Sequence, residues 1–189
     1  EKGGITTYPP GTKENGGIFL HSNPWVMIAE TMVGNGDRAF EYYSQINPAC
    51  KNGCIDEYQC EPYCYPQNIL GDEHPQFGLA RNSWLSGTAS WVYQAAVKYI
   101  LGVRPHYKGI TIDPCIPRAW KEFKIRKHFR GSIYDIRVRN PEGVSKGIRA
   151  IWVDGKVFFG NVLPFFRDNR LHNIEVLMGR DLFVTEEDR

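Results

Sequence analysis

The spacing of apolar residues changes near Val103, and this change constrains the fold more than any other feature of the chain. Before it, apolar residues recur every three or four positions, as over residues 91–99, which is typical of helices. After it, they alternate with charged residues, as over residues 134–138, which is typical of strands with one buried face. The pattern therefore predicts two parts, residues 1–102 and residues 103–189.

Helices are expected in the first part. Asn23-Pro24 places a capping side chain before a proline at the first helical position. Gly34-Asn35-Gly36-Asp37 should end this helix and begin the next, so that residues 24–47 form a helical hairpin. A third helix should run from Gly87 to Leu101 and stop at Gly102. Their apolar residues lie on more than one side, which predicts helices that belong to a larger helical assembly.

The second part is expected to form an antiparallel β sandwich or an addition to one. Strand candidates cover residues 109–113, 134–138 and 174–178, and Asp154-Gly155 between two apolar runs indicates a two-residue hairpin turn. The last residues, 185–189, are polar and are expected to fray.

Charge divides at the same place without pointing to nucleic acid. Residues 1–102 hold 6 Lys and Arg against 10 Asp and Glu, whereas residues 103–189 hold 17 against 11, for a net charge of +2. Basic and apolar residues alternate between Lys121 and Arg130, which favours the solvated face of a strand over a nucleic-acid surface, with docking onto an acidic partner as another possible use. No apolar run approaches the ~20 residues of a membrane span and no signal sequence is visible, so a cytoplasmic location is expected.

Four of the five cysteines fall within 15 residues, at positions Cys50, Cys54, Cys60 and Cys64. Three, five and three residues separate them, which differs from the two-residue knuckles of common zinc sites. The spacing favours free thiols in a reducing compartment over a metal site or a disulfide. No metal ion is therefore expected.

Three segments carry residues suited to chemistry. Residues 8–25 place aromatic, charged and amide groups among prolines and glycines, which suits a rigid site for hydroxyl groups, although His21 could equally be structural. Residues 57–67 combine aromatic rings with carboxylates, which favours a sugar ligand. These carboxylates could act as a general acid and base in glycoside hydrolysis, or they could simply cap helices and pair with Lys and Arg side chains. Within residues 81–91, a Ser-Gly pair at a helix start offers an anion site, although such a pair is also a common cap.

The segments are more specific together than apart. Residues 8–25 read Tyr-Pro-Pro-Gly-x-Lys-Glu-Asn-Gly-Gly-Ile-Phe-x-His-x-Asn-Pro-Trp, residues 61–67 read Glu-Pro-Tyr-x-Tyr-x-Gln, and residues 80–91 read Ala-Arg-Asn-Ser-Trp-Leu-Ser-Gly-Thr-Ala-Ser-Trp. Tyr-Ile-Leu-Gly-Val-Arg-Pro at 99–105 and Asp-Pro-Cys-Ile-Pro at 113–117 continue the pattern. In these motifs the chain resembles the inverting cellobiose phosphorylase family.

The resemblance implies a longer enzyme with an N-terminal β sandwich, a helical linker, a six-hairpin (α/α) barrel that holds the active site, and a C-terminal β jelly-roll layer. Residues 1–102 would be the closing helices of the barrel, and residues 103–189 the C-terminal β-sandwich domain. The chain begins with Glu1 instead of Met, which agrees with a C-terminal portion whose partner is the N-terminal portion of the same enzyme. Members of the family are commonly homodimers.

The implied reaction is reversible phosphorolysis of a β-linked glucose disaccharide to α-glucose 1-phosphate and a free sugar, a glycosyltransferase-type reaction. An aspartic acid protonates the leaving oxygen while inorganic phosphate, a co-substrate and not a cofactor, attacks the anomeric carbon from the opposite face. The resemblance places this acid upstream, so no catalytic residue is assigned here and the segment alone is expected to be inactive. No cofactor is expected.

The resemblance also implies a phosphate cradle built from His21, Ser86 and Gly87. If it is correct, an imidazole nitrogen, the serine hydroxyl and the glycine N–H should converge within roughly 3–4 Å of one point. An inverting hydrolase of similar barrel fold would instead need a carboxylate base near the point of attack. A non-catalytic carbohydrate-binding module would place the function in the β part.

The sugar sites are implied in the same way. Lys13 and Glu14 match positions that hold the acceptor sugar in the +1 site, with Tyr8 beside them, and Gln67 matches a residue that reaches the −1 glucose. Chitobiose phosphorylases are expected to vary at the Lys-Glu pair, which favours cellobiose. Laminaribiose and cellodextrins stay open as alternatives.

Overall fold

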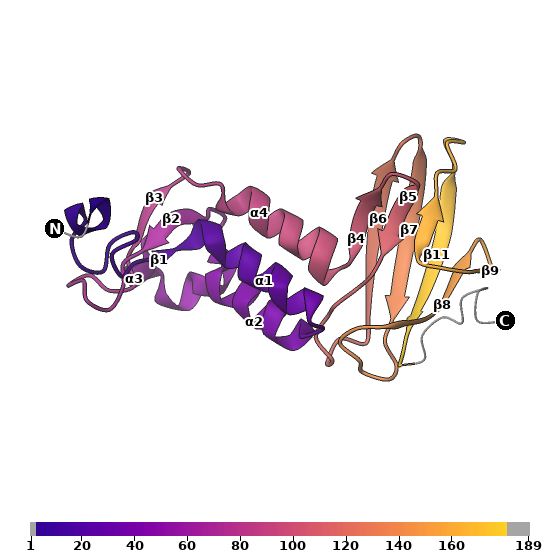
Figure 1. The fold of residues 1–189 in the computed structure, drawn as a ribbon, viewed down its shortest axis with the longest axis horizontal. Helices are drawn as coiled ribbons and strands as arrows, with labels where there is room; N and C mark the ends of the chain where they lie inside the picture. The colour runs from indigo at the N-terminus through magenta and orange to yellow at the C-terminus, as the bar shows by residue number, and fades with distance from the viewer. Residues whose placement is uncertain (1–2, 181–189) are drawn as a thin grey trace. The chain divides into compact units, whose positions relative to one another are not determined.

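The computed structural model describes residues 3–180, which divide into two compact units (Figure 1). The first unit holds residues up to 29 together with residues 41–95, and the second holds residues 30–40 together with those from 96 on. The predicted frayed end at 185–189 lies outside the described residues. Within them, no helix is both long enough and apolar enough to cross a bilayer.

The first helix, α1 (Asn23–Met32), begins where it was predicted, but Asn23 does not cap it. The short 3-10 turn η2 (Leu20–Ser22) leads directly into α1, so Asn23 already has helical backbone angles, with φ −59° and ψ −41°. Its Nδ2 donates a hydrogen bond back to the Phe19 carbonyl oxygen at 2.8 Å. A cap needs an extended backbone, and none is available here.

The turn between α1 and α2 (Gly36–Ile46) forms as predicted. Gly34 has φ +85°, and the Asn35 N–H donates to the Glu30 carbonyl oxygen at 2.8 Å. Gly36 is required for a second reason, because a Cβ at this position would lie 2.2 Å from the carbonyl oxygen of Ile116.

The predicted third helix forms, but its hydrogen-bond pattern changes along its length. An α-helix, α4 (Thr88–Gln94), continues as a π-helical turn, η4 (Ala95–Ile100), in which the Leu101 N–H donates to Ala96 O, five residues back. Gly102 then ends the helix with φ +71°, as expected.

A small sheet in the first unit was not predicted. Strands β1 (Ile18–Phe19), β2 (Pro66–Ile69) and β3 (Ala80–Ser83) are antiparallel, with β2 in the centre. Strands this short leave no visible alternation in the sequence. The remaining elements of the unit are η1 (Gly4–Thr7), η3 (Pro48–Cys54) and α3 (Ile55–Tyr58). The hydrophobic core of the first unit contains Leu20, Met27, Ile46, Tyr58, Ile69 and Val92.

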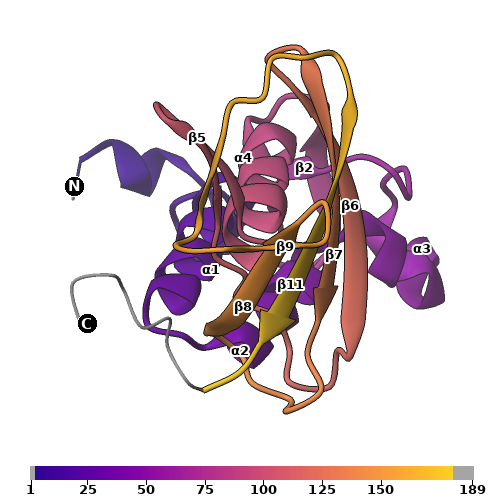
Figure 2. The same cartoon turned by 90° about the vertical axis from the view of Figure 1, so that its right-hand side faces the viewer.

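The second unit contains two sheets. The smaller has the order β10-β5-β4, formed by β4 (Val103–His106), β5 (Gly109–Ile112) and β10 (Val162–Pro164). The larger has the order β6-β7-β11-β8-β9 (Figure 2). Its strands are β6 (Glu122–Phe129), β7 (Ser132–Arg139), β8 (Ile148–Val153), β9 (Lys156–Phe158) and β11 (Leu171–Met178).

One strand pair corrects the antiparallel expectation. Strands β7 and β11 run parallel, with Ile136 opposite Ile174, whereas the other pairs in both sheets are antiparallel. The chain leaves the larger sheet after β9, adds β10 to the smaller sheet, and returns as β11 between β7 and β8. Such a crossover is what a parallel pair requires.

The larger sheet buries one face, as the alternation predicted. The buried apolar residues on its two central strands are Tyr134, Ile136 and Val138 on β7 and Ile174, Val176 and Met178 on β11. Tyr134 donates its hydroxyl hydrogen to the Pro164 carbonyl oxygen of β10 at 2.8 Å, which ties the two sheets together. The predicted hairpin at Asp154-Gly155 joins β8 to β9, and both residues have positive φ.

The basic stretch forms the outer face of β6, as predicted. Lys124 and Arg126 are exposed, and Arg126 pairs with Asp135 of β7 at 2.9 Å. On the same face, Arg137 pairs with Glu122 at 2.6 Å. Cross-strand carboxylates therefore neutralise part of the positive charge on this face.

Candidate functional site

The three motif segments meet in the small sheet of the first unit. Phe19 of β1 lies opposite Asn68 of β2, and Asn68 lies opposite Arg81 of β3. His21 follows β1 directly, while Gly87 lies between β3 and α4. Hydrogen-bonded strands thus bring together segments that are far apart in the sequence.

His21 lies against Gly87. A Cβ built on Gly87 would be 2.6 Å from Cε1 of the imidazole and 3.0 Å from Nδ1, so the ring occupies the space that any larger residue would need. Aromatic rings border the imidazole, with ring centroids 5.7 Å away for Trp25 and 6.5 Å away for Phe19. The half-buried ring is therefore positioned by its neighbours.

The Ser86 hydroxyl is engaged at the start of α4. Its Oγ accepts a hydrogen bond from the Thr88 N–H at 3.0 Å and also contacts the Thr88 hydroxyl. The Gly87 carbonyl oxygen accepts from Ser90 Oγ at 2.9 Å and from the Trp91 N–H at 3.2 Å. The structure thus brings His21 and Gly87 together, while the Ser86 hydroxyl bonds to Thr88 two residues further along the chain.

The loop that holds the predicted acceptor residues is well ordered by hydrogen bonds. Asn15 donates from Nδ2 to the Tyr8 carbonyl oxygen at 2.8 Å, and its own carbonyl oxygen accepts from the Gly11 N–H at 2.7 Å. Lys13 adopts φ +49° and places Nζ 5.1 Å from the centroid of the Tyr8 ring. Glu14 is exposed beside it. Tyr8 and Lys13 therefore lie together in one cluster.

This loop is also fixed to the segment that follows β2. The Gly71 N–H donates to the Gly11 carbonyl oxygen at 2.8 Å. A Cβ on Gly71 would lie only 1.9 Å from the Gly16 carbonyl oxygen, so the two backbone segments touch. Position 71 consequently requires glycine.

Gln67 lies on β2, and its side chain pairs with a residue that the sequence did not single out. Asn82 of β3 donates from Nδ2 to Gln67 Oε1 at 3.1 Å. Asn82 has φ +56°, in the left-handed region that asparagine tolerates better than most residues. The sequence signal was its place inside the third motif, although nothing there indicated its partner.

Glu61 anchors the second motif to the third. Its Oε1 accepts a hydrogen bond from Trp84 Nε1 at 3.0 Å, and its Oε2 accepts a longer contact from the Cys60 thiol at 3.4 Å. The hydrogen bond from Trp84 is the main cause that lowers the pKa of the Glu61 carboxyl group. A carboxylate held in this way is suited to orient Trp84.

All five cysteines are free thiols in the structure. Cys60, Cys64 and Glu61 place potential metal-ligating atoms within 4.8 Å of one another. Burial raises the pKa of the Cys60 thiol to about 12, which favours the thiol over the thiolate that a metal would bind.

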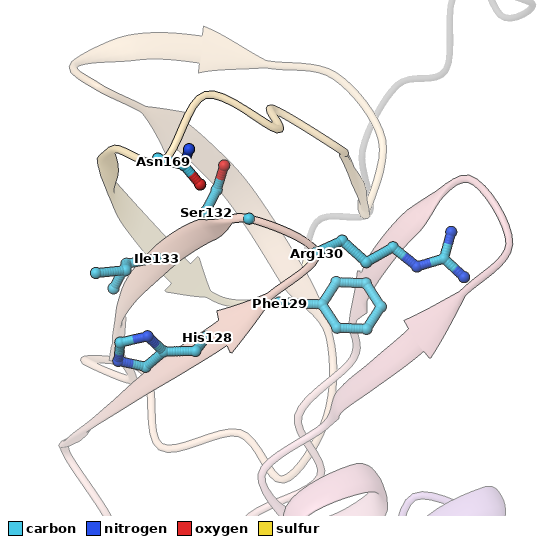
Figure 3. Close-up of a pocket in the computed structure, with 7 residues that line it drawn as sticks. His128, Phe129, Arg130, Ser132, Ile133 and Asn169 are labelled. Carbon is cyan, nitrogen blue, oxygen red and sulfur yellow. The ribbon is translucent and has the colours of Figure 1, made fainter.

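A separate hollow lies at the turn between β6 and β7 in the second unit (Figure 3). His128, Ser132 and Ile133 line it together with Asn169 from the loop before β11. None of the residues predicted to bind sugar or phosphate is among its lining residues, so the hollow is not part of the candidate site.

The family models match both parts of the chain. Residues 1–102 match the catalytic domain of the glycosyl hydrolase 94 superfamily, and residues 103–145 match the C-terminal domain of glycosyl hydrolase family 65. The chain belongs to the glycosyl hydrolase 94 superfamily. This finding confirms the family resemblance drawn from the three motifs.

Several curated relatives of this glycosyl hydrolase 94 chain are phosphorylases. An N,N'-diacetylchitobiose phosphorylase from Vibrio furnissii is 47% identical over 94% of this chain and 22% of that protein. A solabiose phosphorylase from Paenibacillus borealis is 35% identical over 93% of this chain and 23% of that protein. A 3-O-beta-D-glucopyranosyl-beta-D-glucuronide phosphorylase from the same organism is 31% identical over 86% and 21%. The chain therefore spans about a fifth of the length of these relatives.

Proposed function

We propose that this chain is the C-terminal part of a longer enzyme that catalyses the reversible, inverting phosphorolysis of a β-linked disaccharide. The observation that carries the proposal is the contact between His21 and Gly87, which joins the first and third motifs in a chain of this superfamily. Relatives named as phosphorylases, aligned over most of the chain, support the same reaction class.

His21 and Gly87 would hold inorganic phosphate for attack. A ring N–H of His21 and the backbone N–H of Gly87 can both donate hydrogen bonds to phosphate oxygens, with the Ser86 hydroxyl beside them. A hydrolase would need a carboxylate base at this point, whereas the group placed against Gly87 is an imidazole. The general acid would come from the upstream part of the enzyme.

The sugar would lie between the first and second motifs. Tyr8, Lys13 and Glu14 would contact the acceptor sugar, and the contact of their loop with Gly71 would hold them in place. Gln67 would contact the sugar that is transferred to phosphate. These assignments follow the resemblance residue by residue.

Two disaccharides are the first candidates for the substrate. N,N'-diacetylchitobiose is favoured by the relatives from Vibrio furnissii and Vibrio proteolyticus, which are 47% and 44% identical to this chain. Cellobiose is favoured by the Lys13-Glu14 pair and forms the second candidate. A direct comparison of turnover decides between them.

The architecture of the complete enzyme forms part of the proposal. Residues 1–102 would contribute the last helices of an (α/α) barrel, and residues 103–189 a C-terminal jelly-roll layer, in a cytoplasmic homodimer. Exposed apolar residues support a helical partner: Val26 and Met32 on α1 are 50% and 69% exposed, and Tyr93 on α4 is 56% exposed. Upstream helices would cover such surfaces.

The test is an assay of the complete reading frame that contains this chain. Purified enzyme is incubated with N,N'-diacetylchitobiose, cellobiose, laminaribiose or a cellodextrin, with and without inorganic phosphate, and sugar 1-phosphate is measured. Turnover that requires phosphate is the expected result, while hydrolysis without phosphate would refute the proposal. The isolated 189-residue chain serves as a control that should show no turnover.

A further inference from the structure

Gln67 and Asn82 form a cross-strand pair on neighbouring strands. The register places Pro66 opposite Ser83 and Asn68 opposite Arg81, so Gln67 and Asn82 face one another between these pairs. Opposite residues on antiparallel strands have side chains within reach of each other. The hydrogen bond of 3.1 Å from Asn82 Nδ2 to Gln67 Oε1 is the result.

This hydrogen bond determines which end of the Gln67 amide remains for a ligand. A primary amide has one oxygen that accepts hydrogen bonds and one nitrogen that donates two. Because Asn82 occupies Oε1, the Nε2 donors are directed away from Asn82. Gln67 can then offer N–H groups to a ligand oxygen more readily than it can accept a hydrogen bond from a ligand.

We propose that Asn82 is a positioning residue that presents the Nε2 donors of Gln67, and not its Oε1 acceptor, to an oxygen of the bound sugar. The inference rests on the proposed function, in which Gln67 contacts the sugar transferred to phosphate. The inference adds Asn82 to the proposed sugar site. It also assigns the direction of the hydrogen bond, in which the sugar oxygen is the acceptor.

The backbone of Asn82 separates this role from a purely structural one. Its φ of +56° could be adopted with less strain by glycine, so the backbone conformation at this position of β3 does not require an amide side chain. The side chain is exposed, and its Nδ2 donates a hydrogen bond to Gln67. Removal of the side chain should therefore disturb Gln67 while leaving the backbone of β3 intact.

Two substitutions at this position test the polarity in the complete enzyme. Asn82→Asp has nearly the same shape but only accepts hydrogen bonds, so the Gln67 amide should turn over, donate from Nε2 to the new carboxylate, and present Oε1 to the sugar. Asn82→Gly keeps the left-handed backbone and leaves the amide of Gln67 without a preferred orientation. Asn169→Asp is the matched control, because Asn169 is also left-handed, with φ +57°, and lies in the other unit beside the hollow of Figure 3.

Kinetics of the synthetic direction give the decisive readout. The donors are sugar 1-phosphates in which the hydroxyl at C3, C4 or C6 is replaced by hydrogen or by fluorine. Fluorine can accept a weak hydrogen bond but cannot donate one, so it reports whether the enzyme offers an N–H group. The ratio of kcat/KM for the fluoro and deoxy donors is compared between variant and wild type, which cancels the intrinsic reactivity of the donors.

At one of the three sugar carbons, the wild-type enzyme should prefer the fluoro donor over the deoxy donor. Asn82→Asp should lose that preference, whereas Asn169→Asp should keep it. The Asn82→Asp variant should also lose about tenfold in kcat/KM for the natural disaccharide, with Asn82→Gly intermediate and the KM for phosphate within about twofold of wild type.

The outcomes that would overturn the inference are distinct from failure of the proposed function. Suppose that the wild-type enzyme is active, but that Asn82→Asp has the same fluoro-to-deoxy ratio of kcat/KM as wild type at C3, C4 and C6. This result would overturn the positioning role of Asn82 and leave the proposed function standing. An equal rise in the KM for phosphate and in the KM for disaccharide would also overturn the positioning role, because it would indicate general disruption of the fold. A wild-type enzyme that is active only as a hydrolase would refute the proposed function, and the inference with it.

Discussion

The imidazole of His21 lies against the α-carbon of Gly87, with Cε1 only 2.6 Å from the position that a Cβ would occupy. The ring comes from the turn after β1 and the glycine from the start of α4, so the contact holds two motifs together. In the proposed phosphate site, the imidazole nitrogens and the backbone N–H groups at the helix start would face one ligand, because no side chain separates them. This geometry makes position 87 sensitive to the smallest substitution.

Gly87→Ala should weaken phosphate binding in the complete enzyme. The added methyl group overlaps the imidazole of His21, so the ring must move away from the helix start. We expect the KM for phosphate to rise about tenfold while the KM for disaccharide changes by less than about twofold. Initial rates of phosphorolysis at varied concentrations of each substrate measure both constants.

Gly53→Ala is the control for this substitution. Gly53 lies in the same unit, and a Cβ built there has no atom within 4 Å, so its kinetic constants should equal those of wild type. If Gly87→Ala also leaves the KM for phosphate unchanged, His21 and Gly87 do not share a phosphate site.

His21→Ala should raise the KM for phosphate far more than the KM for disaccharide. The imidazole would donate to phosphate, and the variant lacks that donor while the sugar-binding loop is unchanged. Steady-state kinetics with both substrates varied gives the comparison, and His128→Ala, at an exposed position on β6, is the control. Equal effects on both substrates would show that His21 is only a structural residue.

Gly71→Ala should disturb the acceptor loop. Its Cβ would lie 1.9 Å from the Gly16 carbonyl oxygen, and a backbone atom cannot move aside as a side chain can. We expect a loss of about 2 kcal/mol in the free energy of unfolding, together with a raised KM for disaccharide. Urea denaturation and steady-state kinetics measure the two effects, and unchanged values for both would contradict the close backbone contact.

Elements with a long or sharply ended pattern could be predicted from the sequence. Pro24 and Gly34 mark the limits of α1, and Gly102 ends the third helical segment, because each residue restricts the backbone by its own chemistry. The alternation over residues 134–138 extends through most of β7 (Ser132–Arg139) and identified its buried face.

The missing parts depend on contacts between distant residues. Strands β1, β2 and β3 are too short to show a period, and they exist because they pair with one another. The parallel pairing of β7 with β11 depends on where the chain returns after β10, which local patterns do not encode. The pair formed by Gln67 and Asn82 could not be predicted from the sequence for the same reason, because it follows from the register of β2 and β3.

Alkylation should divide the cysteines into two groups. Cys50 and Cys54 are exposed, whereas Cys60, Cys64 and Cys115 are buried. Burial raises the pKa of the Cys60 thiol to about 12 and that of Cys115 to about 11, so little reactive thiolate is present at neutral pH. Mass spectrometry after brief treatment with iodoacetamide should find Cys50 and Cys54 modified first. Early modification of Cys60 would contradict its burial.

The stability of the second unit should depend on pH through His172. Its Nδ1 lies 2.7 Å from an oxygen of Asp154, and its Nε2 lies 3.2 Å from Asp168, so both ring nitrogens face carboxylates. Burial alone would lower the pKa of His172, but the hydrogen bonds with the two carboxylates outweigh it and raise the pKa. For Asp168, burial acts to raise the pKa, while the Arg170 N–H, His172 and Ser132 together lower it to about 2.

The sign of the pH dependence follows from these shifts. A raised folded-state pKa means that the stabilisation from His172 is complete below about pH 6.5, the unfolded value, and is lost as the pH rises through the folded value. The lowered pKa of Asp168 means that its contribution is present above about pH 4 and is lost as the pH falls toward 2. The cluster should therefore stabilise the fold most between about pH 4 and pH 6.5.

His172→Gln tests this window, because glutamine cannot carry the positive charge that both carboxylates require. The difference in melting temperature between wild type and variant should be largest near pH 5 and should shrink above the raised pKa of His172. Thermal denaturation from pH 4 to pH 9, followed by circular dichroism, measures the difference, with His128→Gln as a matched control at an exposed position on β6. A difference that stays constant across this range would show that His172 contributes by packing against Phe166, whose ring centroid lies 3.7 Å away, and not by its charge.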